Sequence, residues 1–136
     1  MISMMSAIGA AKDNIRVDVL YGSKLPQGGV IQQILFLERI AKLFSEGALK
    51  GKLLLRVTGT GQRPTNLEQS LLLKGVTGVR FGRPTADEVT DLLAEGEVGT
   101  TAVYICGPPQ MTDFLAEVLV RRQAVSEDLV LTEKWW

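Results

Sequence analysis

The chain has 136 residues, enough for one domain with a hydrophobic core, and 46% of them are hydrophobic, which excludes a disordered chain. Its 15 basic and 15 acidic residues give a formal net charge of zero, so nucleic acid and anionic membranes are not the expected partners. One cysteine and no histidine exclude a disulfide framework, a zinc finger and a Ser-His-Asp triad.

The lone thiol favours a reducing compartment. No apolar run approaches the roughly 18 residues of a membrane span. Residues 1–12 are apolar but lack the basic lead-in and the cleavage site of a signal peptide, so we interpret them as a helix. We expect an intracellular protein, cytoplasmic or mitochondrial, that has no membrane span.

Hydrophobic periodicity predicts helices that alternate with strands. In chain order, the predicted elements are a helix over 1–11, a strand over 15–20, a helix over 30–44, a strand over 52–57, a helix over 86–94, a strand over 101–106, a helix over 109–123 and a strand over 128–132. Capping-box patterns at Thr65–Glu68 and Thr85–Glu88 predict helix starts. This alternation predicts an α/β fold with a mostly parallel sheet flanked by helices, in one domain over residues 1–136.

The stretch from Val103 to Met111, with the sequence VYICGPPQM, is the most informative in the chain. It indicates a strand that ends at Cys106, a turn at Gly107 where the backbone can approach a ligand closely, and a helix opened by Pro109. A free cysteine is often only a small buried residue, but this turn builds an open edge. Because ligands of open α/β sheets bind at the carboxyl ends of strands, Cys106 is a candidate site residue.

The last predicted strand is followed by Glu133-Lys134-Trp135-Trp136. A charged, aromatic end is usually just solvated. Together with Cys106-Gly107-Pro108-Pro109, however, it resembles the nicotinamide-binding domain of the ferredoxin–NADP reductase superfamily, and within it the oxidoreductase NAD-binding domain-containing group. Those domains are Rossmann-like and end in a carboxylate, a spacer and an aromatic residue.

The resemblance implies hydride transfer from a reduced nicotinamide to a flavin. It places Cys106 beside the nicotinamide C4 and Glu133 near that cysteine, as the two catalytic candidates, while Trp135 covers the flavin ring. The cofactor-binding candidates are Tyr21, Gly22, Ser23, Lys24, Thr58, Gly107, Pro108, Pro109, Met111 and Trp135. No metal site is expected.

The cofactor is NADH or NADPH by this resemblance. Residues 58–63 read TGTGQR and offer Gly-x-Gly without the third glycine, so the dinucleotide fingerprint is not met. This segment corresponds to the part of related domains that holds the adenosine end, and Arg63 either reaches a 2′-phosphate or faces solvent. Both nucleotides therefore stay candidates.

The resembling domain begins with a strand and a glycine-rich pyrophosphate loop, and a flavin-binding barrel precedes it; none of these is found in this sequence. We therefore expect an amino-terminally truncated domain that lacks its first strand. Either the strands over 15–20 and 101–106 close on each other, or the chain is unstable alone. FAD is expected only from a missing domain or another chain, and the isolated chain is expected to be weakly active or inactive.

Two other functions stay open. The first is an inactive truncated form that acts as an interaction module or has no independent activity. The second is a flavodoxin-like binding module, which the absence of a phosphate-binding glycine loop after any strand disfavours. Beyond the nicotinamide dinucleotide, the expected partners are a flavin domain or an electron acceptor.

Overall fold

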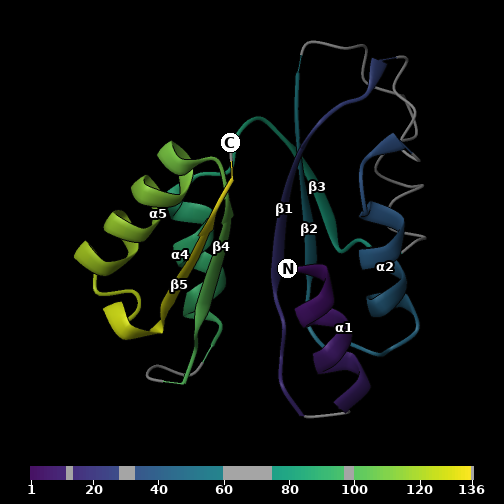
Figure 1. The fold of residues 1–136 in the computed structure, drawn as a ribbon, viewed down its shortest axis with the longest axis horizontal. Helices are drawn as coiled ribbons and strands as arrows, with labels where there is room; N and C mark the ends of the chain where they lie inside the picture. Colours follow the sequence, from purple (N-terminus) through teal and green to yellow (C-terminus); the bar gives the residue numbers. More distant parts are fainter. Residues whose placement is uncertain (12–13, 28–32, 60–74, 97–99, 136) are drawn as a thin grey trace. The chain divides into compact units, whose positions relative to one another are not determined.

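The computed structural model describes residues 1–11, 14–27, 33–59, 75–96 and 100–135. The described elements are, in order, α1 (Ile2–Ala11), β1 (Val19–Lys24), α2 (Leu37–Ser45), β2 (Leu53–Thr58), β3 (Gly78–Phe81), α4 (Ala86–Ala94), β4 (Val103–Gly107), α5 (Pro109–Arg121), a 3₁₀ turn (Glu127–Leu129) and β5 (Val130–Lys134) (Figure 1). The chain divides into two compact units, Met1–Pro84 and Thr85–Trp136. All strand pairs are parallel and helices flank them, so the α/β prediction is confirmed, and the arrangement is consistent with a Rossmann-like fold.

The first unit is a three-stranded sheet in the order β1-β2-β3, with α1 and α2 alongside it (Figure 1). Because side chains alternate along a strand, Leu53, Leu55 and Val57 all point to the same face of β2, where they are buried. They share one hydrophobic core with Met5 of α1 and Ile40 of α2. The leucine-rich segment predicted as a strand therefore forms the centre of this unit.

The second unit pairs β4 with β5, in a register that runs from Val103↔Val130 to Gly107↔Lys134. α5 packs on both strands and contacts α4. Ile105 of β4 is buried against Leu115 and Leu119 of α5. The Thr85 side chain accepts from the Glu88 N–H and the Glu88 side chain accepts from the Thr85 N–H, which confirms the predicted capping box and the helix over 86–94.

Several predicted boundaries were wrong. β1 begins at Val19 rather than at residue 15 and continues through Lys24, because its pairing with β2 extends to Lys24↔Thr58. α2 begins at Leu37 rather than at residue 30, since Phe36 has a left-handed backbone with a φ of 63° that a continuing helix cannot accommodate. The strand over 78–81 was missed, because four residues carry little periodicity.

Four further predictions concern the end of β5, the sheet membership of β1 and β4, a second capping box and a membrane span. β5 runs to Lys134, so Glu133 lies within a strand rather than in a tail after it. β1 belongs to the three-stranded sheet of the first unit and β4 to the two-stranded sheet of the second, and the expected closure of the strands over 15–20 and 101–106 on each other stays a prediction. The capping box at Thr65–Glu68 lies outside the described residues. Among the helices that the structure describes, none has the length and apolarity needed to cross a bilayer.

Gly107 sets how closely α5 approaches the end of β4. A Cβ built at Gly107 would lie 2.3 Å from the Met111 Cε. Residue 107 is on the same side of β4 as buried Ile105, which faces α5. The glycine therefore leaves room for the first turn of α5, in addition to any role it has toward a ligand.

We expect Gly107→Ala to lower the free energy of unfolding by about 1–3 kcal/mol, because the new methyl group displaces Met111. Met111→Ala in the same chain should remove much of this cost, so the double variant is more stable than the sum of the two single changes predicts. Urea unfolding of the four proteins measures this coupling. The matched pair Gly107→Ala and Leu131→Ala should be additive, and additivity in both pairs would contradict the packing role.

Leu53 is fully buried, whereas the Leu35 side chain is 67% exposed. Leu53→Ala should therefore cost about 2–5 kcal/mol of unfolding free energy through the lost burial and the cavity. Leu35→Ala should change it by less than about 0.5 kcal/mol. Urea unfolding followed by circular dichroism compares the two, and equal losses would show that β2 is not the centre of the core.

Candidate functional site

One face of the β4–β5 sheet gathers the chemically versatile side chains of the second unit. The register places Cys106 opposite Glu133 and Tyr104 opposite Leu131. Because alternate residues share a face, these four side chains and Trp135 lie together, on the face opposite to the one that packs on α5. We call the carboxyl end of this face, formed by Tyr104, Cys106, Glu133 and Trp135, the β4–β5 rim.

Cys106 and Trp135 meet in this rim. The Trp135 indole N–H donates to the Cys106 sulfur, with Nε1 and Sγ 3.2 Å apart. The Trp135 backbone N–H donates to the Gly107 carbonyl oxygen at 3.1 Å, which extends the ladder one residue beyond β5. The thiol is partly exposed and the indole is 50% exposed, so both groups are accessible to a ligand.

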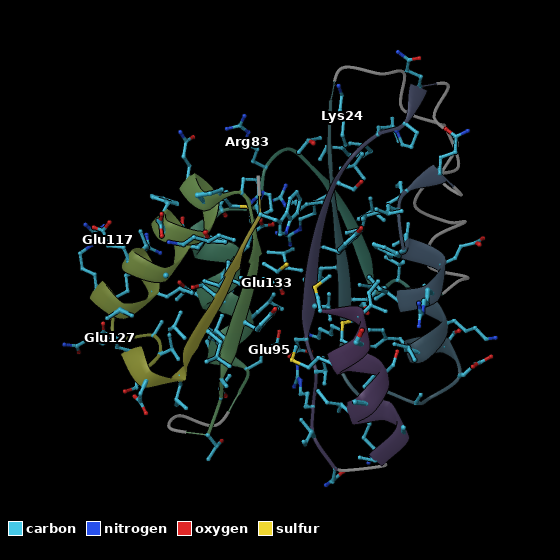
Figure 2. The ribbon with its side chains drawn as sticks, in the orientation of Figure 1. Lys24, Arg83, Glu95, Glu117, Glu127 and Glu133 are labelled. Carbon is cyan, nitrogen blue, oxygen red and sulfur yellow. The ribbon has the colours of Figure 1, made fainter. Side chains whose placement is uncertain are left out.

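Glu133 is held by Tyr104. The Tyr104 hydroxyl donates to Oε2 of Glu133, and Figure 2 shows the Glu133 side chain on this sheet. This hydrogen bond lowers the pKa of Glu133. The same bond, together with burial and the neighbouring negative charge, raises the pKa of Tyr104 to about 12. At neutral pH the rim therefore holds an ionised carboxylate and a neutral phenol.

The next residue, Lys134, faces the other way. Its ammonium lies 2.6 Å from the Asp113 carboxylate of α5. Consecutive residues of β5 thus present opposite charges to opposite faces of the sheet. The negative charge belongs to the rim, and the positive charge is paired with α5.

The first unit has an open depression of about 410 Å³ at the carboxyl ends of β2 and β3. Gly59 and Gly82 follow the two strands with φ angles of 111° and 102°, which residues with a Cβ rarely adopt. Lys24 packs over Gly59, and Arg83 lines the depression. Both basic side chains project at this end of the sheet (Figure 2). The lining residues are Val57, Thr58, Gly59, Phe81, Gly82 and Arg83.

Of the cofactor-binding residues predicted on β1, some lie beside Thr58 of β2 and others do not. Ser23, Lys24 and Thr58 come together, because the Thr58 hydroxyl donates to the Ser23 carbonyl oxygen at 3.3 Å. The Tyr21 hydroxyl instead donates to the Leu35 carbonyl oxygen, and burial raises its pKa. Gly22 is exposed, and a Cβ there would meet Pro84 at 3.4 Å.

The remaining predicted residues lie at the start of α5. Pro108 is the N-cap and Pro109 is the first helical residue, as expected, and both are exposed. Trp136 and residues 60–63 lie outside the described residues, so the expectations for Arg63 are not addressed. Among the described residues, no group of three or more histidine, cysteine or acidic side chains is placed to hold a metal ion.

Sequence reasoning missed two sets of residues. Gly82 and Arg83 were missed because the strand before them was not identified; the Gly-Arg-Pro run after a short apolar stretch is the signal that points to them. Tyr104 was taken only as a strand residue. No sequence signal identifies it, because its contact with Glu133 depends on a pairing between strands 29 residues apart.

Part of the chain is similar to curated proteins named Oxidoreductase NAD-binding domain-containing protein 1. The proteins from Homo sapiens and Pongo abelii are each 40% identical to it over 55 residues, which is 40% of this chain and 16% of either relative. The protein from Bos taurus matches over the same length with the same identity. The match thus spans about a sixth of the length of these relatives. No family model matches the chain, and no solved structure matches it.

Proposed function

We propose that this chain is a nicotinamide dinucleotide-binding domain of an oxidoreductase, and that the nicotinamide ring binds at the β4–β5 rim. The observation that carries the proposal is the 3.2 Å contact between the Trp135 indole and the Cys106 sulfur. It joins an aromatic plane to a thiol at the carboxyl end of two parallel strands. The names of the partly similar proteins, which contain "NAD-binding", support the same class of ligand.

The residues of the rim fit a flat, conjugated ring. An indole face that is half exposed offers a stacking surface. The thiol lies at its edge, and the Glu133 carboxylate is on the neighbouring strand opposite Cys106. The bound nicotinamide would supply the hydride, whereas the contribution of the protein is to bind and orient the ring and to set the charge around it.

The finer assignment is a ferredoxin-reductase-type domain whose hydride acceptor is a flavin, held by another domain or another chain. The exposed indole of Trp135 is the group in the rim that suits a flavin ring. Within the first unit, the basic residues Lys24 and Arg83 are, together with Thr58, candidates for contacts with a phosphate group. Both NADH and NADPH stay candidate ligands.

The test uses the two tryptophans of the chain. In the Trp136→Phe variant, where Trp135 is the sole tryptophan, NADH should quench the fluorescence saturably with a micromolar Kd. Trp135→Phe, which retains Trp136, is the matched control and should show much weaker quenching and a Kd raised about tenfold by the lost stacking surface. Free tryptophan amide corrects for absorption by NADH.

Cys106→Ala should raise the Kd for NADH severalfold without changing the unfolding midpoint, because the thiol is at the rim and not in the core. NADPH and FAD are titrated in the same way to test the finer assignments. A flat response to every nucleotide would contradict the proposed function and favour an interaction module. Equal quenching in both single-tryptophan proteins would place the ligand away from the rim.

A further inference from the structure

We infer that Tyr104 is a positioning residue of the nicotinamide site, and that it holds the Glu133 carboxylate where this charge favours the oxidised ring over the reduced one. The inference rests on the proposed function. It adds to that function a role for Tyr104, which no sequence motif indicates. It also specifies which form of the dinucleotide, oxidised or reduced, the rim binds more tightly.

The geometry of the strand pair brings the two groups together. Tyr104 and Cys106 are two residues apart on β4 and therefore share a face, and Glu133 lies opposite Cys106 on β5. The Tyr104 hydroxyl donates to Oε2 of Glu133. Glu133 is exposed, so its side chain is kept from turning into solvent by hydrogen bonds to Tyr104 and, more weakly, to Cys106. The phenol thus fixes a carboxylate that packing alone does not hold.

Among the rim residues, Glu133 carries the dominant charge. On β4, the side chains beside Glu133 are the Tyr104 phenol and the Cys106 thiol, and both lower its pKa by hydrogen bonding, Tyr104 more strongly. On β5, Trp135 is neutral and directs its N–H to the sulfur. Lys134, the basic residue of these two strands, lies on the other face beside Asp113 of α5.

A fixed negative charge distinguishes the two redox forms of a nicotinamide. The oxidised ring carries a positive charge, and the reduced ring, which has gained a hydride with its two electrons, is neutral. A carboxylate beside the ring attracts the first and is nearly indifferent to the second. Holding Glu133 in the rim therefore lowers the Kd for NAD⁺ relative to the Kd for NADH.

The experiment compares wild type with Tyr104→Phe, which keeps the ring and removes the hydroxyl, and with Glu133→Gln. Ser126→Ala is the matched control, because Ser126 also donates a hydroxyl to a carboxylate of this unit, that of Asp128 at 2.5 Å, away from the rim. Carboxyl ¹³C NMR follows the titration of Glu133, which Glu133→Gln assigns. Calorimetry gives the Kd for NAD⁺ and for NADH.

Tyr104→Phe should move the titration midpoint of Glu133 upward, toward its ordinary value, because the bond that stabilises the ionised form is lost. It should also raise the Kd for NAD⁺ about tenfold, the size expected for one hydrogen bond to a charged group, and change the Kd for NADH less than about twofold. Glu133→Gln should do the same to the two Kd values. Ser126→Ala should change neither the midpoint nor the two Kd values.

The preference of the wild type for NAD⁺ should disappear as the pH falls through the depressed pKa of Glu133, whereas in Tyr104→Phe and in Glu133→Gln this preference should already be lost at neutral pH. An unchanged Glu133 midpoint in Tyr104→Phe, or an equal rise of both Kd values, would overturn the role of Tyr104 and leave the proposed function standing. A wild type that binds neither NAD⁺ nor NADH would overturn both.

Discussion

The parallel pairing of β4 with β5 is the constraint on which the candidate site depends. Its register puts Cys106 opposite Glu133, and it continues past the last strand residue through the bond from the Trp135 N–H to the Gly107 carbonyl oxygen. Because side chains alternate across a strand, a slip of one residue would turn Glu133 and Trp135 to the face covered by α5. The thiol, the carboxylate and the indole lie together at the rim only because the backbone fixes their order along two neighbouring strands.

The helix α5 packs on the opposite face of the sheet and stabilises this register. Ile105 is buried against the helix, Gly107 leaves space for Met111, and Lys134 is tied to Asp113. On the strands, Ile105, Gly107 and Lys134 are each adjacent in sequence to a rim residue. The two strands therefore alternate between a structural face and a chemical face, and the structural face supplies the rigidity that a binding site needs.

Sequence analysis succeeded where the signal was local. The helix opened by Pro109 and the capping box at Thr85 each depend on a few adjacent residues with defined backbone preferences, and both were confirmed. The turn predicted at Gly107 was misplaced by one residue, because Gly107 pairs with Lys134 as the last residue of β4. Sequence analysis failed at β1, where pairing with β2 decided the ends of the strand, and at Phe36, whose left-handed backbone delays the start of α2 to Leu37. The Trp135–Cys106 and Tyr104–Glu133 contacts are non-local, because each joins two strands that are distant in sequence. Neither composition nor periodicity determines the register in which these strands pair. The resemblance anticipated that Cys106, Glu133 and Trp135 would be neighbours, and the roles given to these residues stay predictions.

The opposite charges of Glu133 and Lys134 have a further consequence. Exchanging these two adjacent residues would produce a permuted chain of identical length, composition, isoelectric point and net charge. In that chain a cation would stand beside the thiol, and an anion would stand beside Asp113 of the helix. The polarity across the thickness of the sheet would be inverted, and a ring that becomes positive on oxidation would meet repulsion in place of attraction. Which face of the sheet carries the negative charge thus depends on the order of two adjacent residues, and composition, isoelectric point and net charge do not reveal that order.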